Sequence, residues 1–156
     1  LLSLNTGLRR GELTSLEWAD IDFHAKHLTV RAAAAKSGTM RRIPVNDEAT
    51  DVLKQWRKQV GTEGRIFPFR DFKTAWGALL DEAKIADFRW HDLRHHFASR
   101  LAQAGVNLNA IRDLMGHADL KMTLRYSHLS PDNLAAAVAL LGASPPTKSA
   151  QRRKRV

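Results

Sequence analysis

His91 and Arg94 place two basic side chains on one face of a predicted helix. They stand three positions apart, a spacing that brings side chains together on a helix, and their face is offset from the one that carries Leu93 and Phe97. A purely structural domain has little use for cations placed this way, although a solvated basic face has the same pattern. A zinc site on His91 and His95 is disfavoured, because the glutamate of the His-Glu-x-x-His motif is missing and Arg94 would repel a dication.

Two other fragments contain residue types that do chemistry in enzymes. The tetrapeptide Leu-Met-Gly-His at 114–117 is followed by Tyr126, the only tyrosine in the chain. On its own, His117 is as consistent with a capping or packing histidine, and Tyr126 with a half-buried core residue whose hydroxyl binds backbone. In Thr-Gly-Leu-Arg-Arg-Gly-Glu-Leu at 6–13, Arg9 could simply pair with Glu12 on a helix surface. None of these fragments identifies a function by itself.

The charge of the chain favours a polyanionic partner. The 156 residues include 25 Lys and Arg against 16 Asp and Glu, which gives a net charge of +9 and a pI near 10.5. A chain this basic most often binds nucleic acid, and charge for solubility alone is the alternative. Five of the cations lie in Pro145–Val156, which contains no acidic residue and is predicted to be a disordered basic tail.

Other features of the composition exclude several classes of protein. The chain has no cysteine, which excludes a disulfide scaffold, a thiolate nucleophile and a cysteine-ligated zinc site. No apolar run is long enough to span a bilayer, so we expect no membrane partner. No signal peptide is recognisable. Because the chain begins Leu1-Leu2-Ser3 without methionine, we expect an N-terminally truncated fragment of a longer protein.

The spacing of apolar residues predicts one mostly helical α+β domain with a small antiparallel hairpin. Strands are predicted at 27–31 and 40–45 around a turn at Ser37-Gly38, and Pro44 indicates that the second is an edge strand. Helices are predicted over 9–18, from Asn46 or Asp47 to 59, over 72–85 after an Asp71 cap, over 91–104, from Asn107 or Asn109 to 116, over 119–128, and from Ser130-Pro131-Asp132 to Leu141.

Taken in order, five segments resemble the catalytic domain of the tyrosine recombinase, or phage integrase, family. They are Thr-Gly-Leu-Arg-Arg-Gly-Glu-Leu at 6–13, Lys36 with Arg42-Ile43-Pro44, His-Asp-Leu-Arg-His at 91–95, Leu-Met-Gly-His at 114–117, and Tyr126-Ser-His. The resemblance covers 1–142, which we expect to be the catalytic domain, with 143–156 as the tail. It implies the family's mainly helical fold with a small antiparallel sheet on one side, and a missing N-terminal domain that clamps DNA.

The resemblance implies an enzyme that cleaves and rejoins DNA strands without metal, ATP or any cofactor. Tyr126 would be the nucleophile and would form a 3′-phosphotyrosine link. Arg9 and Arg94 would grip the non-bridging phosphate oxygens, a task that suits planar guanidinium groups better than lysine. Lys36, at the tip of the hairpin, would protonate the leaving 5′-oxygen.

Supporting roles follow from the same resemblance. His91 would receive the proton of the tyrosine, His117 would support the phosphate by a hydrogen bond, and Glu12 would orient the cations. The neighbouring His95 and His96 do not coincide with catalytic positions of the family and are predicted to be packing or capping residues.

The expected partner is double-stranded DNA. Four further basic residues are expected to contact it: Arg10, Arg41, Arg42 and Lys121. On DNA the chain would assemble as a homotetramer, and it would be a monomer when free, in a cytoplasmic, nucleoid-associated protein. Two alternatives stay open: a type IB topoisomerase, which shares this chemistry and fold core, and a DNA-binding module without catalytic activity.

Overall fold

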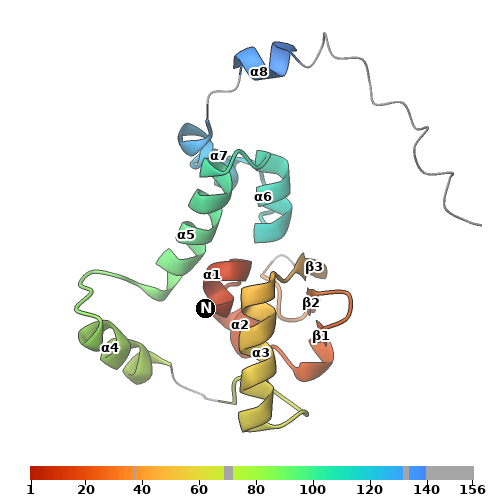
Figure 1. Ribbon diagram of the computed structural model, residues 1–156, viewed down its shortest axis with the longest axis vertical. Coiled ribbons are helices and arrows are strands. Elements are labelled where there is room, and N and C mark those ends of the chain that lie inside the picture. The colour runs from red at the N-terminus through yellow and green to blue at the C-terminus, as the bar shows by residue number, and fades with distance from the viewer. Residues whose placement is uncertain (37, 69–71, 132–133, 140–156) are drawn as a thin grey trace, which may run out of the picture.

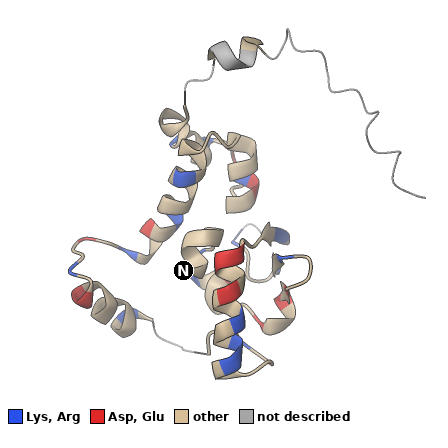
Figure 2. Cartoon of the chain, in the orientation of Figure 1, with Lys and Arg blue, Asp and Glu red and all other residues tan. Residues whose placement is uncertain are grey.

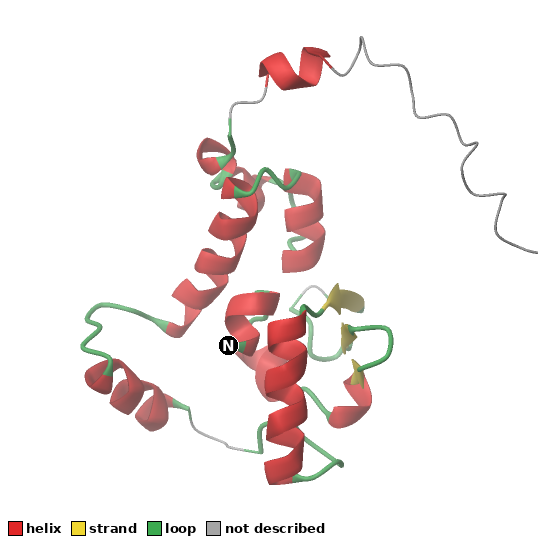
Figure 3. Ribbon diagram, in the orientation of Figure 1, coloured by secondary structure: helices red, strands yellow, loops and turns green. Residues whose placement is uncertain are grey.

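The described part of the protein is mainly helical, with one small sheet (Figure 3). A computed structural model describes residues 1–36, 38–68, 72–131 and 134–139. Within these ranges the helices are α1 (Leu2–Thr6), α2 (Arg10–Thr14), α3 (Asp47–Val60), α4 (Lys73–Glu82), α5 (Trp90–Gln103), α6 (Leu108–Met115), α7 (Lys121–Leu124) and α8 (Leu134–Ala139), with 3₁₀ turns η1 (Trp18–Asp20) and η2 (Ser127–Leu129). None of the helices in the described part of the chain combines the length and the hydropathy that a membrane span requires.

Three antiparallel strands form the sheet, in the order β1 (Ile21–Asp22), β2 (His27–Val30) and β3 (Arg41–Pro44). The two predicted strands are confirmed, and β1 is an additional short strand that the sequence pattern did not indicate. Leu28 pairs with Ile43, and both side chains are buried. Pro44 lies in an edge strand, as predicted, where its missing N–H costs no ladder hydrogen bond.

Two hydrophobic clusters form the interior of the part of the chain that the structure describes. The first lies among α1, α2, α3 and the sheet; its largest fully buried side chains are Leu8, Leu16, Leu28, Ile43, Leu53 and Ile66. The second lies among α5, α6 and the segment after α7; its buried members are Phe97, Ala98, Ala102, Ile111, Met115 and Tyr126. Figure 1 shows α5 and α6 side by side above α1, α3 and the sheet. Leu114 of α6 packs against both clusters.

Local signals fix the ends of several helices. The side chain of Asn46 accepts a hydrogen bond from the Ala49 N–H at the start of α3, as predicted. Acidic residues lie in the first turn of α3 and basic residues in its last turn, which complements the helix dipole (Figure 2). α1 ends at Gly7 with φ 62°, where a Cβ atom would lie 2.4 Å from the ring of Phe97. Only glycine therefore fits where α1 meets α5.

Parts of the helical prediction were wrong. The helix predicted over 9–18 is helical only over Arg10–Thr14, and the helix predicted over 119–128 is interrupted. α7 ends at Leu124 because the Tyr126 N–H donates to the Thr123 carbonyl, a tighter turn than an α-helix makes. The interruption leaves Tyr126 between α7 and η2, outside any α-helix.

Some predictions concern residues that the structure does not describe. Asp71, Asp132 and the segment 140–156, including the predicted tail at 143–156, lie outside the described residues. The last helix is described over Leu134–Ala139, and the place where it begins lies outside the described residues.

Candidate active site

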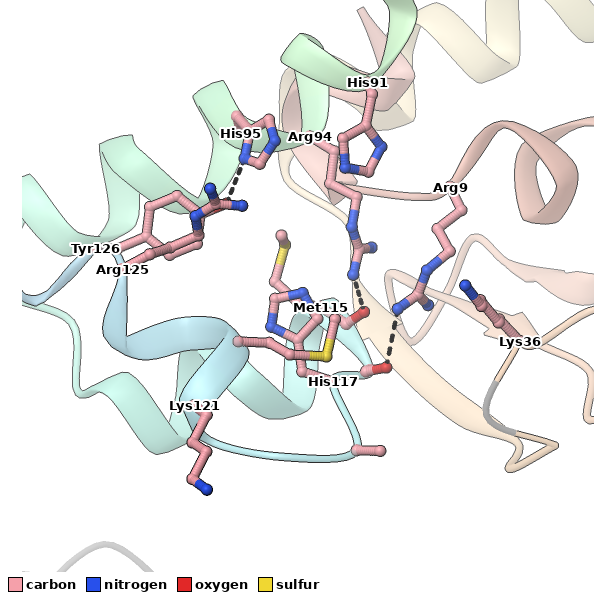
Figure 4. Close-up of a pocket in the computed structure, with 13 residues that line it drawn as sticks. Arg9, Lys36, His91, Arg94, His95, Met115, His117, Lys121, Arg125 and Tyr126 are labelled. Atoms are coloured by element: carbon pink, nitrogen blue, oxygen red, sulfur yellow. Dashed lines mark hydrogen bonds between the residues drawn. The ribbon is translucent and has the colours of Figure 1, made fainter.

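All six residues that the resemblance marked as catalytic line one pocket of about 560 Å³: Arg9, Lys36, His91, Arg94, His117 and Tyr126 (Figure 4). They come from the α1–α2 junction, the β2–β3 connection, α5, the residue after the αL cap of α6, and the α7–η2 junction. Five segments that are distant in the sequence therefore meet at this pocket.

The carbonyl end of α6 binds three arginines. Arg41 Nε donates to the Leu114 carbonyl at 3.3 Å, Arg94 donates to the Met115 carbonyl, and Arg9 donates to the Gly116 carbonyl at 3.2 Å. The last carbonyls of a helix have no partner within the helix and carry its negative partial charge. Three successive carbonyls thus hold three guanidinium groups that would otherwise repel one another.

Glu12 is the carboxylate within this group of arginines. Its side chain is 1% exposed and accepts hydrogen bonds from Arg9 at 3.0 Å and from Arg41 at 3.0 and 2.8 Å. It also accepts from the backbone N–H of Arg9, which caps α2. Burial by itself raises the pKa of Glu12, but the hydrogen bonds from Arg41 and Arg9 outweigh burial and hold the pKa below its usual value. Glu12 is therefore ionised and accepts hydrogen bonds from both arginines, and its role in orienting the cations stays a prediction.

Arg94 is a buried cation whose hydrogen bonds go to carbonyls. Besides Met115, its guanidinium donates to the Gly7 carbonyl at 2.6 Å, and the residue is 3% exposed. Burial, followed by the charge of Arg9, lowers the pKa of Arg94 to about 10, so it stays protonated at neutral pH. Three arginines around one carboxylate leave an excess of positive charge beside the pocket, which favours binding of an anion.

His117 is a neutral hydrogen-bonding group. Its Nδ1 lies 2.9 Å from the hydroxyl of the buried Thr123. Burial and the nearby charges of Arg94, Arg9 and Arg41 lower the pKa of His117 to about 4. The residue before it, Gly116, adopts φ 61°, and a Cβ there would lie 2.8 Å from the guanidinium carbon of Arg41. The absence of a side chain at 116 therefore lets Arg41 approach the end of α6.

The hydroxyl of Tyr126 contacts His95 and not the predicted His91. The Tyr126 oxygen lies 2.6 Å from His95 Nδ1, and the tyrosine is 5% exposed. His91 instead packs edge-on against His95, with ring centroids 4.8 Å apart. His95, which the sequence predicts to be a packing or capping residue, also lines the pocket and contacts the Tyr126 hydroxyl. Its spacing of four from His91, which puts both rings on one face of α5, was the signal that could have identified it.

The four predicted DNA contacts have different surroundings. Arg10, Arg42 and Lys121 are exposed, and Lys121 also lines the pocket. Arg41 departs from its prediction, because its side chain is 11% exposed and is bound to Glu12. Arg41 lies two positions from buried Ile43 in β3, so strand alternation points it inward. Within the described residues, no group of three or more histidines and acidic residues is placed to hold a metal ion.

The chain is similar to integrases in sequence and in structure. The integrase of Salmonella phage P22 is 34% identical over an alignment that covers 97% of this chain and 45% of that protein. The catalytic domain of bacteriophage HP1 integrase superposes with a TM-score of 0.74 at 27% identity, over 94% of this chain and 82% of that one. The Tn1549 transposon integrase in complex with a circular intermediate DNA gives a TM-score of 0.72 at 26% identity, over 91% of this chain and 57% of that one.

The family assignment rests on most of the chain. The model of the phage integrase family matches residues 1–133, which include all five predicted motifs. The chain spans less than half the length of the P22 integrase. The fold predicted from the resemblance, mainly helical with a small antiparallel sheet, is confirmed. The chain belongs to the phage integrase family, the tyrosine recombinase family that its motifs resemble.

Proposed function

We propose that the chain is the catalytic domain of a site-specific DNA recombinase that cuts and rejoins strands through a covalent 3′-phosphotyrosine, without metal or ATP. The observation that carries the proposal is the joint opening of Tyr126, Arg9, Arg94 and His117 into one pocket. A tyrosine facing an excess of buried positive charge is suited to attack a phosphodiester. The solved complex of the related Tn1549 integrase with DNA supports double-stranded DNA as the partner.

In this mechanism the pocket stabilises a pentacoordinate phosphorane. Arg9 and Arg94 hold the two non-bridging oxygens, and the carbonyls of α6 fix the directions of both guanidinium groups before substrate arrives. Neutral His117 adds a hydrogen bond to the same phosphate. Lys36 gives a proton to the leaving 5′-oxygen, which leaves a free 5′-hydroxyl. Because the phosphotyrosine keeps the phosphodiester's bond energy, that hydroxyl can reverse the reaction without ATP.

Incubation with a suicide substrate tests the proposal directly. The duplex has a nick a few nucleotides to the 3′ side of the cleaved bond. After cleavage, the short fragment that carries the new 5′-hydroxyl diffuses away, so the strand cannot be rejoined and the protein stays covalently bound to the DNA. Because the target is unknown, a pool randomised around the nick is used first, and adducts recovered by denaturing electrophoresis identify the sequence. The full-length gene product is assayed beside this chain. Transfer of the trapped strand to a second duplex separates a recombinase from a topoisomerase, and the lack of any adduct leaves the non-catalytic DNA-binding module.

We expect binding to duplex DNA to be weak and to fall steeply as salt rises, because lysine and arginine contacts to phosphate release counterions. Arg10→Gln and Arg42→Gln should each lower the slope of log affinity against log salt by about one. Lys58→Gln, an exposed residue of α3 that does not line the pocket, is the matched control. Titrations by fluorescence anisotropy measure the slopes, and an affinity that is insensitive to salt contradicts the proposal.

Deleting Pro145–Val156 should weaken non-specific binding to duplex DNA and leave strand cleavage intact.

We also propose that the chain is a monomer in solution and assembles as a homotetramer on DNA. In the resembled family, the segment that follows the nucleophile often docks on a neighbouring protomer, and α8 occupies that place here. Light scattering after size-exclusion chromatography should give a monomer mass without DNA and a four-chain complex with a paired recombination substrate. A stable tetramer without DNA rules this proposal out.

The DNA partner also implies a cytoplasmic, nucleoid-associated protein.

A further inference from the structure

We propose that His95 is the base that takes the proton of Tyr126 when the tyrosine attacks phosphorus. The inference rests on the proposed function and adds to it a residue outside the set that the resemblance supplied. Its basis is the contact between His95 Nδ1 and the Tyr126 hydroxyl at 2.6 Å, in a pocket that both residues line. A proton acceptor must lie within hydrogen-bonding distance of the atom it deprotonates, and His95 meets this condition.

His95 and Tyr126 are each held in place by the packing of a different segment. His95 lies in the second turn of α5, a helix of 14 residues whose Phe97 and Ala98 are buried. The ring of Tyr126 is buried in the second hydrophobic cluster, so the segment after α7 packs directly on α5. The ring centroids of His95 and Tyr126 are 6.1 Å apart. The contact is thus made by two anchored side chains.

The two histidines share charged neighbours and differ in what they contact. His95 is near His91, Asp92 and Arg94 of its own helix and near Arg125 of the opposite segment. Arg94 and Asp92 also act on His91, together with Arg9 and Arg89. The difference between the two rings is therefore one of contact: His95 touches the Tyr126 hydroxyl, and His91 packs edge-on against His95.

The protonation states suit a proton transfer in this direction. Burial, then the charges of His91 and Arg125, lowers the pKa of His95, so its ring is neutral at physiological pH. Burial raises the pKa of Tyr126, so the phenol keeps its proton until a base removes it. Nδ1 can accept that proton when the ring carries its hydrogen on Nε2.

The transfer balances in both directions. In cleavage, the Tyr126 proton moves to His95 Nδ1, the phenolic oxygen bonds to phosphorus, and the bond from phosphorus to the 5′-oxygen breaks with a proton from Lys36. In rejoining, the 5′-hydroxyl gives its proton back to Lys36 and bonds to phosphorus, the phosphotyrosine bond breaks, and His95 returns its proton to the phenolic oxygen. No net proton is lost over one cycle.

The test compares wild type with His95→Asn in single-turnover cleavage of the selected suicide duplex, from pH 6 to pH 9. Asparagine can hold the hydroxyl with its side-chain oxygen but cannot take a proton at these pH values. We expect a rate loss of roughly 10²–10⁴ at pH 7, the range for a general base. The ratio of the two rates should then shrink by about tenfold for each pH unit, because hydroxide replaces the missing base. Effects of Lys36 on the pH profile cancel in this ratio.

Two variants complete the design. His96→Asn changes the exposed neighbour of His95 and should match wild type at every pH. His91→Asn should have a defect that does not vary with pH. A His95→Asn variant as fast as wild type, faster than wild type, or slowed equally at every pH would overturn the assignment of His95 while leaving the recombinase intact. Wild-type protein that forms no adduct on any duplex in the pool would overturn the proposed function itself.

A readout without DNA checks the contact separately. Nitrogen-15 NMR of the histidine rings should find His95 neutral at pH 7 with its proton on Nε2, and the Nδ1 resonance should shift in Tyr126→Phe. A His95 ring that carries its proton on Nδ1, or that does not respond to Tyr126→Phe, contradicts the proposal.

Discussion

Replacing Tyr126 with phenylalanine should abolish formation of the covalent protein–DNA adduct. The substitution removes one oxygen and keeps the ring that fills the second hydrophobic cluster. No second tyrosine can substitute, because Tyr126 is the only one in the chain. Denaturing electrophoresis of the suicide reaction measures the adduct, which wild-type protein should form equally well in excess EDTA. The expected loss is complete within the sensitivity of the gel.

The control for Tyr126→Phe is to measure that the variant still folds and still binds DNA. Losing the hydrogen bond to His95 should cost about 1 kcal/mol of unfolding free energy, since the half-buried imidazole can recover a partner from water. Affinity for duplex DNA should stay the same, because the phosphate contacts are unchanged. An adduct that persists in Tyr126→Phe, or a wild-type adduct that needs magnesium, contradicts the mechanism.

Lys36→Ala should slow strand cleavage by about two to four orders of magnitude, the range for removal of a general acid. Lys36 is exposed on the connection between β2 and β3, and it lines the pocket beside Arg9 (Figure 4). A departing 5′-alkoxide is a strong base and needs a proton as it leaves. Rates of adduct formation under single-turnover conditions measure the defect, and Lys58→Ala on α3 is the control for a lost surface charge.

A duplex with sulfur in place of the bridging 5′-oxygen separates proton donation from DNA binding. A thiolate leaves without a proton, because its conjugate acid has a pKa near 8.5. Lys36→Ala should therefore recover most of its rate on this substrate, while a variant that only binds DNA less well would be slowed equally on both. Equal defects on the oxygen and sulfur substrates would remove Lys36 from the chemical step.

The sequence predicted the parts of this site that depend on local pattern. The strands around Lys36, the cap at Asn46 and the stop of α6 at Gly116 follow from residue types that act within a few positions of themselves. The six catalytic candidates followed from motif order, and they line one pocket although the sequence alone gives no distance between them.

What the sequence missed depends on how separate segments pack. Tyr126 meets the second turn of α5 from the junction between α7 and η2, where its N–H donates to the carbonyl of the buried Thr123, and the local sequence pattern predicts an unbroken helix there. His95 therefore looked like a packing residue. Arg41 looked like a surface cation beside Arg42, although its place two residues from Ile43 puts it on the buried face of β3, where it needs a carboxylate.

The three arginines at the end of α6 also make the phosphate site a property of tertiary docking. Arg9 and Arg41 belong to segments that pack with the first hydrophobic cluster, whereas α6 contributes Ile111 and Met115 to the second. Moving the clusters apart would take the carbonyl partners away from the guanidinium groups and undo the site. Docking and site formation are thus one equilibrium. By linkage, a phosphate bound to these arginines would stabilise the docked arrangement, so in the proposed recombinase the DNA substrate would contribute to the free energy of folding.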